Sequence, residues 1–343
     1  MSIRVIQLGA GIRGRHWAGF IRDYSDAKCV AFVDPDLTAL EAVRSITEDN
    51  GCKFEQDLEL ALKNVEADAA LVVTPSILHA DQVIRCLDAG LTVMVEKPLA
   101  VNVDEAQRMI ERSNQTGKQI IVAENYRFFR AERTVKQILK DGRIGEIDNA
   151  VMVDRRHMPS YTEGPWLANT DYAQLQEIAI HHFDSLRAFF GSAPKSVTVK
   201  VWNPGWTDYK HGTNTEAFVD FDKVRVQYFG TLLSHRFSCS IWVEGSEGSL
   251  WTDRKRVFWR PKKSRWFRPV RHSQVPPGDE ATYPRAGTTA LLNALRDAVK
   301  SETVAETEAR DNIWTVAMVE AGKISDRERR TVALAEVYEA HGA

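Results

Sequence analysis

The chain has 343 residues, of which 45 are Lys or Arg and 47 are Asp or Glu, so its formal net charge is −2. At roughly 150 residues per domain, this length predicts two domains. The composition, 43% hydrophobic and 27% charged, indicates a globular protein and excludes a disordered or fibrous one. The near-neutral balance argues against a chain coated in positive charge for nucleic acid.

The cysteines and the apolar runs bear on location and on metals. The four cysteines show no CxxC spacing and no grouping with histidine at zinc-ligand spacing, so we expect reduced thiols, no metal site and a cytoplasmic protein. The chain starts in a strand-like run without a charged leader, and no apolar run approaches the ~20 residues that a membrane helix needs. We therefore expect neither secretion nor a membrane anchor.

The first element in chain order is a strand over residues 3–8 that ends in a glycine-rich loop. The loop reads Gly9-Ala10-Gly11-Ile12-Arg13-Gly14, and a helical pattern with Trp17, Phe20, Ile21 and Tyr24 follows it. The glycines allow a tight turn, close approach of the backbone to a pyrophosphate, and close packing of helix on strand. The helix N-terminus adds unpaired N–H groups. We predict that Gly9, Gly11, Ile12, Arg13 and Gly14 bind a dinucleotide.

An acidic residue follows the second predicted strand, residues 29–33. Asp34 lies 20 residues beyond Gly14, where a carboxylate meets the ribose hydroxyls of the cofactor. The next residues, Pro35-Asp36-Leu37-Thr38, include no Arg or Lys to receive a 2′-phosphate, so NAD is favoured over NADP. The alternative role for Asp34 is the cap of a helix that begins near Leu37.

The alternation of strands and helices continues to residue 123. We predict helices over 58–62, 78–89 and from the Asn102 cap to Gly117, and strands over 69–73, 92–95 and 120–123. This order implies right-handed crossovers and a parallel sheet with ligands at the carboxyl ends of its strands. Polar residues stand at two of those ends: Thr74-Pro75 with His79, and Glu96-Lys97-Pro98. Taken alone, the second group also fits a turn with a solvated lysine, and its proline fits a cis bond.

The pattern changes in the second half, which predicts antiparallel sheet. Residues 197–201 alternate as a half-buried strand, and residues 218–221 and 224–229 predict a hairpin turning at Asp222-Lys223. Helices are expected over 131–141, 289–299 and about 308–326.

A helix over residues 172–190 carries the second set of candidate groups. Glu177, His181 and Asp184 are spaced i, i+4 and i+7 and are predicted to share one face. His182 lies on the apolar stripe and is predicted to pack in the core. A carboxylate beside His181 would orient a histidine that accepts and returns a proton. The alternative is an ordinary solvated polar face.

Taken together, these motifs resemble the glucose–fructose oxidoreductase/inositol dehydrogenase (Gfo/Idh/MocA) family over nearly the whole length. The glycine loop, Thr74-Pro75 with His79, Glu96-Lys97-Pro98, Asn125-Tyr126-Arg127-Phe128 leading to Gly142-Arg143-Ile144-Gly145-Glu146, and the histidine helix stand in the family's order. The resemblance implies an α/β fold with an N-terminal Rossmann dinucleotide-binding domain at 1–124. It also implies a C-terminal α+β domain at 125–343 with an open, mostly antiparallel sheet that binds substrate and serves as the interface of a homodimer or homotetramer.

The resemblance also implies an NAD-dependent dehydrogenase that oxidises a secondary hydroxyl of a sugar, inositol or related polyol. Lys97 and His181 would act at the reacting carbon, with Glu177 as the third catalytic residue, and Thr74, Pro75, His79, Glu96 and Lys97 would border the cofactor. Three departures stand out: Glu177 replaces the usual Asp, Asp171-Tyr172-Ala173-Gln174 replaces a glycine-rich lead-in, and Arg130 replaces a proline.

Substrate contacts are predicted before the catalytic helix. Arg155, Arg156, His157, Tyr161 and Trp166 offer hydrogen-bond donors and an aromatic wall, and His157 and Trp166 join Lys97 and His181 in the predicted substrate set. Two other functions stay open on the same fold: a hydrolase or lyase that uses bound NAD transiently to cleave a glycoside, and a ligand-sensing regulator.

The stretch from Arg254 to Arg271 has nine Lys or Arg, no acid and four aromatic residues. It fits a nucleic-acid patch, but a sheet-edge hairpin or part of an oligomer interface is favoured.

Overall fold

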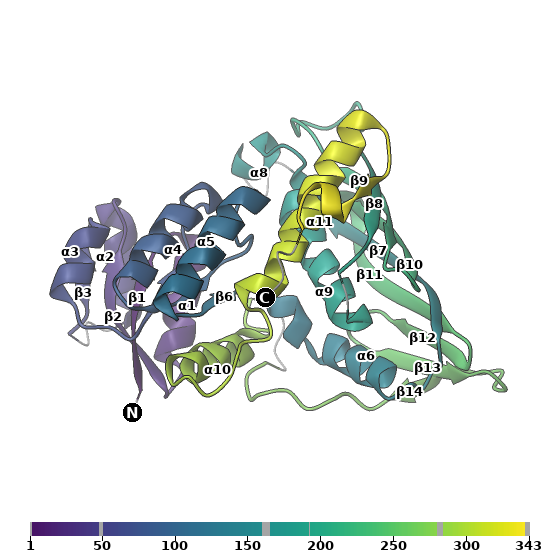
Figure 1. Cartoon of the computed structure of the whole chain (residues 1–343), viewed down its shortest axis with the longest axis horizontal. Coiled ribbons are helices and arrows are strands. Elements are labelled where there is room, and N and C mark those ends of the chain that lie inside the picture. The colour runs from purple at the N-terminus through teal and green to yellow at the C-terminus, as the bar shows by residue number, and fades with distance from the viewer. Residues whose placement is uncertain (1, 48–50, 160–164, 192, 280–283, 340–343) are drawn as a thin grey trace. The chain divides into compact units, whose positions relative to one another are not determined.

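The computed structural model describes residues 2–47, 51–159, 165–191, 193–279 and 284–339, and divides into two compact units (Figure 1). The first unit consists of residues 1–125 and 276–316, and the second of residues 126–275 and 317–343. The predicted functional boundary at 124/125 stays a prediction, while residues 276–316 join the N-terminal segment.

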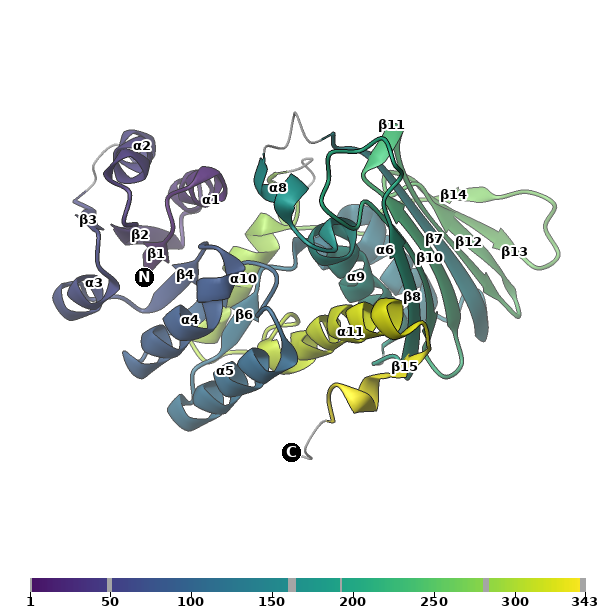
Figure 2. The same ribbon diagram turned by 90° about the horizontal axis from the view of Figure 1, so that it is seen from above.

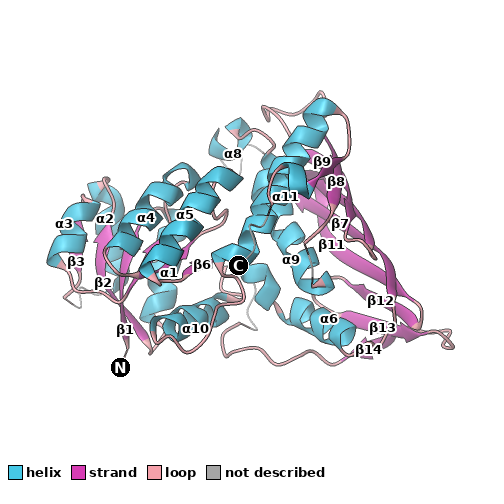
Figure 3. Ribbon diagram, viewed as in Figure 1, coloured by secondary structure: helices cyan, strands magenta, loops and turns pink. Residues whose placement is uncertain are grey.

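The first unit is built on a six-stranded parallel sheet in the order β3-β2-β1-β4-β5-β6 (Figure 3). Its order reverses between β1 and β4, which is the dinucleotide-binding arrangement, and the α/β fold class predicted from the alternation is confirmed. The strands are β1 Ile3–Leu8, β2 Ala27–Val33, β3 Lys53–Glu55, β4 Ala69–Val72, β5 Thr92–Val95 and β6 Ile120–Val122.

Helices pack on this sheet through apolar stripes, such as the buried Trp17, Ala18 and Ile21 of the first helix. Asn102 caps the fifth helix by accepting from the Glu105 amide at 2.8 Å, as predicted. The helices of the first unit are α1 Ile12–Arg22, α2 Leu37–Thr47, α3 Leu58–Asn64, α4 His79–Asp88, α5 Val103–Thr116 and α10 Thr288–Val299, with the short turn η1 Ser76–Leu78.

The second unit contains a nine-stranded sheet in the order β14-β13-β12-β11-β7-β10-β9-β8-β15. Neighbouring strands are antiparallel except β7 and β10, so the predicted mostly antiparallel sheet is confirmed. The strands are β7 Ile147–His157, β8 Ser196–Trp202, β9 Asn214–Asp220, β10 Arg225–Thr231, β11 Leu233–Gly245, β12 Gly248–Thr252, β13 Val257–Pro261, β14 Arg268–Val270 and β15 Val332–Ala333.

Helices lie against one face of this sheet (Figure 2). They are α6 Arg130–Lys140, α9 Ile180–Phe190 and the second-unit part of α11, a helix over Ala309–Glu328; α8 Pro165–Asn169 is shorter. Strand residues alternate, so that Ala150 and Met152 are buried on the helix side while Val151 is exposed on the other. In the described part of this unit, no helix covers that other face.

Two further observations concern the cysteines and the helices. All four cysteines are free thiols. Within the described ranges, no helix is both long and apolar enough to span a membrane.

Candidate active site

The glycine loop of the first unit is shaped by two close backbone approaches. Gly9 has φ +96°, and a Cβ there would lie 2.4 Å from the Val73 carbonyl oxygen. A Cβ on Gly14 would lie 2.3 Å from the Gly9 carbonyl oxygen. Beneath the loop, the buried Gln7 amide donates to the carbonyls of Gly9 and Gly14 at 2.9 and 2.8 Å. Both glycines are therefore required by packing within the fold.

Gly11 differs from them because nothing lies within 4 Å of the position of its Cβ. It is the N-cap residue of α1, and no side chain caps the amides of this helix. Open space over a glycine and uncapped amides at a helix N-terminus are what a pyrophosphate needs. The loop therefore fits a dinucleotide.

Asp34 follows β2 and accepts two backbone hydrogen bonds. One comes from the Ala10 amide in the glycine loop at 2.7 Å and the other from the Asp36 amide at 2.9 Å. The side chain that caps α2 is that of Asp36, which accepts from the Thr38 amide at 2.8 Å. The alternative role of Asp34 as the helix cap is therefore wrong, because that position belongs to Asp36.

Glu96, at the end of β5, is bound to the first helix. Its Oε1 accepts from Arg13 Nε at 2.5 Å and from the Trp17 indole at 2.6 Å, and its Oε2 accepts from the Lys97 amide at 3.2 Å. Burial acts to raise the pKa of Glu96, but Arg13, Trp17 and Lys97 outweigh it and hold the pKa below its usual value. The predicted cofactor residues Arg13 and Glu96 are thus joined as an ion pair.

His79 connects the segments that follow β4 and β5. Its Nδ1 lies 2.8 Å from the Pro98 carbonyl and its Nε2 lies 3.0 Å from the Thr74 carbonyl. Burial lowers the pKa of His79, and the hydrogen bonds to the two carbonyls oppose that shift. The Lys97–Pro98 peptide is cis, Lys97 is half-buried and Pro75 is exposed. The Thr74-Pro75 and Lys97-Pro98 segments therefore lie together in the first unit.

The catalytic helix predicted in the second unit is not uniformly α-helical. Residues 175–179 form a π-helical turn, η3, directly before α9. Tyr172, where the predicted helix begins, has φ +54°. The predicted i, i+4 pair of Glu177 and His181 therefore begins in a π turn and ends in the α-helix. Such turns are frequent at functional sites.

Asp184 on α9 is not part of a solvated face. Its carboxylate accepts from Arg127 Nε at 2.5 Å and Nη2 at 2.6 Å, and the side chains are 0% and 4% exposed. Arg127 belongs to the short turn η2, Asn125–Phe128. The alternative of a solvated polar face is therefore wrong for Asp184, which has a bidentate buried partner.

His181 is 9% exposed, and its ring is stacked on Tyr126. The ring centroids are 4.2 Å apart and the planes differ by 12°. Glu177 is half-buried in the π turn. Burial lowers the pKa of Lys323 in α11, and the Glu177 carboxylate is among the charges that oppose this shift.

His182 is buried as predicted, but among polar groups. Gln174 donates to the Tyr228 hydroxyl at 2.7 Å, and His182 Nδ1 lies 2.9 Å from the same hydroxyl oxygen. Burial and the charges of Arg254 and Arg156 lower the pKa of His182 well below 6.5.

Ligand atoms of Asp154, His182 and Cys239 lie within 4.8 Å of one another. Arginines occupy the surroundings that a cation would need: Arg254 Nη1 is 3.5 Å from His182 Nε2, and Arg156 donates to Asp154 at 2.8 Å. Two fixed positive charges at the group disfavour a metal ion there.

The basic stretch 254–271 is mainly the β13–β14 hairpin at one edge of the sheet. Its first residue is an exception, because the Arg254 guanidinium is buried, pairs with Glu132 and lies 4.3 Å from the centre of the Tyr126 ring. Arg254 also has φ +63° in the turn between β12 and β13, a conformation rare outside glycine. The interpretation of all nine Lys and Arg residues as one exposed strip is therefore wrong for Arg254.

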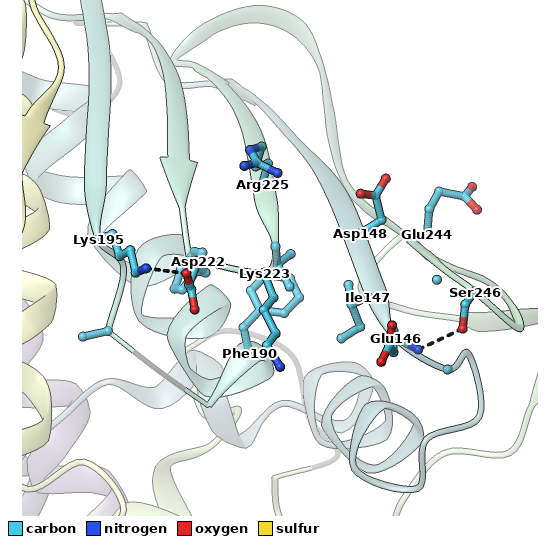
Figure 4. A pocket seen from close by; sticks show the side chains of 15 residues that line it. Glu146, Ile147, Asp148, Phe190, Lys195, Asp222, Lys223, Arg225, Glu244 and Ser246 are labelled. Atoms are coloured by element: carbon cyan, nitrogen blue, oxygen red, sulfur yellow. Dashed lines mark hydrogen bonds and ion pairs between the residues drawn. The ribbon is translucent and has the colours of Figure 1, made fainter.

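The predicted substrate residues lie in the second unit, apart from Lys97. His157 is exposed at the end of β7, with Nδ1 2.9 Å from the Ser234 carbonyl. Trp166 in α8 is 59% exposed. Tyr161 lies outside the described residues. An open hollow elsewhere in this unit, bounded by Glu146, Phe190, Asp222 and Arg225 among others (Figure 4), contains none of the predicted site residues.

The sequence indicated no place in the interior for Glu132, Asp154 or Tyr228, and it placed Tyr126 only in a family segment and Arg254 only in the basic stretch. One signal was available: Asp154 follows Ala150 and Met152 at the buried positions of β7, and a charged residue in such a register needs a buried partner.

Comparisons with known proteins give the family. The family model described as "Oxidoreductase family, NAD-binding Rossmann fold" matches residues 3–124, and the model of the "GFO/IDH/MocA C-terminal domain" matches residues 133–251. The chain belongs to the Gfo/Idh/MocA oxidoreductase family. Its N-terminal part is an NAD-binding Rossmann domain, so the predicted cofactor class is confirmed.

Individual relatives are distant. An inositol 2-dehydrogenase of Rhizobium meliloti (strain 1021) is 28% identical over 203 residues, 58% of each chain. D-apiose dehydrogenase of Paraburkholderia graminis is 25% identical, over 95% of this chain and 88% of its own, and scyllo-inositol 2-dehydrogenase (NADP(+)) of Bacillus subtilis is 22% identical, over 97% and 96%. An uncharacterized protein of Sinorhizobium fredii and the inositol 2-dehydrogenase are matched over 63% and 58% of their own lengths.

Solved structures share the fold. An oxidoreductase from Agrobacterium radiobacter, crystallised with NAD+, L-tartaric acid and magnesium, superposes with a TM-score of 0.87 at 17% identity, covering 98% of this chain and all of that one. The WlbA dehydrogenase of Bordetella pertussis, crystallised with NADH and UDP-GlcNAcA, has a TM-score of 0.80 at 20% identity, covering 97% and 99%.

Proposed function

We propose that the protein is an NAD-dependent dehydrogenase that oxidises a secondary hydroxyl of a sugar, inositol or related polyol. The observation that carries this proposal is that two relatives aligned over nearly the whole chain, and a third aligned over part of it, are dehydrogenases of inositols or of apiose. The glycine cradle and the carboxylate of Asp34 supply the cofactor side of that activity.

The proposed chemistry assigns one role to each of three residues. When bound, NAD+ accepts a hydride from the alcohol carbon. His181 takes the proton of the hydroxyl group as general base, and the Lys97 ammonium donates a hydrogen bond to the same oxygen, where negative charge develops. The carboxylate of Glu177 favours the protonated form of His181.

For the cofactor, the proposed contacts follow the first unit. Gly9, Gly11, Ile12, Arg13 and Gly14 form the pyrophosphate loop, while Thr74, Pro75, His79, Glu96 and Lys97 form or support the segments after β4 and β5. Asp34 would bind the ribose hydroxyls through the carboxylate lone pairs that the Ala10 and Asp36 amides do not use. Its charge would repel a 2′-phosphate, which favours NAD over NADP.

For the substrate, we propose His157 and Trp166 beside Lys97 and His181. Both His157 and Trp166 are accessible in the second unit, and they offer a hydrogen-bonding ring and an aromatic wall of the kind that polyol sites use.

A second copy of the chain is the proposed protein partner, in a homodimer or homotetramer. Across the uncovered face of the sheet, the register aligns Phe218, Gln227, Val151, Trp242 and Trp251 in one transverse row. Phe218 is 51% exposed, and Val151 and Trp242 are each 37% exposed. An aromatic-rich row on a wide, uncovered sheet suits an isologous interface.

The test is a screen of the purified protein with NAD+ against inositols, aldoses, sugar acids and glycosides, monitored by NADH absorbance. We expect net NADH formation with at least one polyol, lost in Lys97→Met and in His181→Asn. If the two residues serve one step, the double variant loses little more than either single variant. Absence of NADH with every alcohol would contradict the proposal.

The same screen separates the alternative hydrolase or lyase. Transient oxidation during glycoside cleavage returns the hydride, so that activity releases sugar from a glycoside without net NADH. The two relatives aligned over nearly the whole chain are named as dehydrogenases, and this similarity does not favour the hydrolase or lyase.

A further inference from the structure

A cluster of charged and aromatic side chains in the interior of the second unit has no role in the proposed chemistry. It comprises the buried Tyr126 from η2, Glu132 from α6 and Asp154 from β7, together with the half-buried Arg156 from β7 and Arg254 from the β12–β13 turn. Buried charges are costly unless they are paired and hydrogen-bonded.

The centre of this cluster is the ring of Tyr126. The His181 imidazole is stacked on it at 4.2 Å and 12°. The Tyr126 hydroxyl accepts from Arg156 Nη2 at 3.1 Å, and Arg254 Cζ lies 4.3 Å from the ring centre. Tyr126 is therefore held at its hydroxyl, at its ring and by the histidine.

Both arginines are themselves anchored. Arg156 Nε donates to Asp154 Oδ2 at 2.8 Å, and Arg254 Nε donates to Glu132 Oε1. The positive φ of Arg254 shows that the turn adopts an unfavourable backbone conformation while its guanidinium reaches this place. The contacts thus run from two carboxylates through two guanidinium groups to one phenol ring.

We propose that Tyr126 is the positioning residue of His181, and that Arg156 and Arg254 hold Tyr126 for that task. This inference rests on the proposed function, in which His181 moves the proton of the alcohol. A general base must present its nitrogen at hydrogen-bond distance and in the right plane, and a flat stack on a clamped ring restricts rotation of the imidazole about its Cβ–Cγ bond.

The kinetic test compares Tyr126→Leu, which removes the stacked ring, with Tyr126→Phe, which keeps the ring and removes the hydroxyl. A misplaced base costs up to about 100-fold in rate. We expect kcat to fall by about 10- to 100-fold in Tyr126→Leu, with the KM for NAD+ unchanged and the pH profile of kcat altered. Tyr126→Phe loses the Arg156 hydrogen bond but keeps the stack on His181 and the contact with Arg254, so it should lose less and keep at least about a third of wild-type kcat. Wild-type kcat in Tyr126→Leu, or equal losses in both variants, would overturn the proposal.

The arginine step has a matched control. Arg143 lies 4.2 Å from the centre of the Trp259 ring, the same kind of contact outside the cluster. The paired variant Arg254→Met/Glu132→Gln avoids leaving one buried charge alone, and it should lower kcat, whereas Arg143→Met should not. Equal kcat in the two would overturn the role of Arg254.

One measurement does not depend on turnover and separates this proposal from the proposed function. In carbon–proton NMR spectra of the histidines, the Cε1–H resonance of His181, assigned by its loss in His181→Gln, should be shifted upfield by the tyrosine ring current. We expect it to move downfield in Tyr126→Leu and to stay in place in Tyr126→Phe. An unmoved resonance in Tyr126→Leu would overturn the stacking even if no polyol is ever oxidised. The expected shift without any alcohol oxidation would leave the stack supported and the proposed function contradicted.

Discussion

The guanidinium of Arg127 holds the carboxylate of Asp184 through two parallel hydrogen bonds in the interior of the second unit. Removing one partner of such a pair leaves a buried charge without its main counter-charge, which costs about 3–5 kcal/mol. Arg127→Met should therefore lower the free energy of unfolding by that amount, as measured by urea denaturation. Lys195→Met breaks the exposed pair with Asp222 and serves as the control, for which little change is expected. Comparable losses in the two variants would contradict this reading of the buried pair.

Alanine substitution at two glycines of the cofactor loop should affect different properties, stability at Gly14 and NAD+ binding at Gly11. Gly14→Ala places a methyl group 2.3 Å from a carbonyl oxygen and should destabilise the protein by about 1–3 kcal/mol. Gly11→Ala places it in open space at φ −63°, so the melting temperature should hardly change. The methyl group would still obstruct the pyrophosphate, so NAD+ binding measured by calorimetry should weaken about tenfold, or 1.4 kcal/mol. A Gly11→Ala protein with wild-type NAD+ affinity would show that the cofactor does not approach this loop.

The cofactor preference should depend on Asp34 and not on its neighbour Asp36. Asp34→Asn keeps an oxygen for the Ala10 or Asp36 amide while removing the charge. Because a hydrogen bond to a charged group contributes about 1.5–3 kcal/mol, the preference for NAD+ over NADP+ should fall by about 10- to 100-fold. Asp36→Asn, at the cap of α2, should leave the ratio of the two kcat/KM values unchanged. A shift caused by Asp36 alone would place the ribose elsewhere.

Acid should destabilise the protein through His182. The pKa of its buried ring is well below 6.5 in the folded state, so the unfolded chain binds this proton more readily. The resulting stability is complete above pH 6.5 and is lost as the pH falls towards the folded-state pKa, with a slope of at most about 1.4 kcal/mol per pH unit. His182→Gln should be less stable than wild type at pH 7.5 but should lose less stability between pH 6.5 and 5. Parallel curves for both proteins in urea denaturation would show that another group causes the acid sensitivity.

The first unit was largely predictable because its local signals agree with one another. The glycine loop, the strand before it and the Asn102 cap each specify their own short segment, and the crossover rule then orders the strands. The three-residue strand β3 was not expected, because so short a segment has no periodicity to detect. The role of Asp36 as the cap of α2 could not be distinguished from that of Asp34 on spacing alone, since both precede Leu37.

In the second unit, the parts that failed are those fixed by contacts between distant segments. Arg254 and Glu132 are 122 residues apart in the chain, and only the folded sheet brings them to Tyr126. Helical periodicity placed His181 and His182 on different lines, and the structure has His181 stacked on Tyr126 and His182 tilted against the same ring. Periodicity alone cannot reveal a π-helical turn. Except for Asp154, whose register in β7 indicates burial, the charged residues of the interior resemble ordinary surface charges until their partners are known.

The first unit is composed of two separate stretches of chain, and this affects how it is made. Helix α10 buries Leu291, Leu292 and Leu295, Arg296 bonds to Asp26 at 2.8 Å, and the Val122 amide donates to the Thr307 carbonyl at 2.8 Å. During synthesis from the N-terminus, the ribosome must therefore produce the nine-stranded sheet segment up to β14 before the nucleotide-binding sheet receives its last helix. Until then, the nascent Rossmann domain leaves an apolar surface uncovered. Completion of the NAD-binding unit therefore depends on translation of residues 276–316, which follow most of the second unit in the chain.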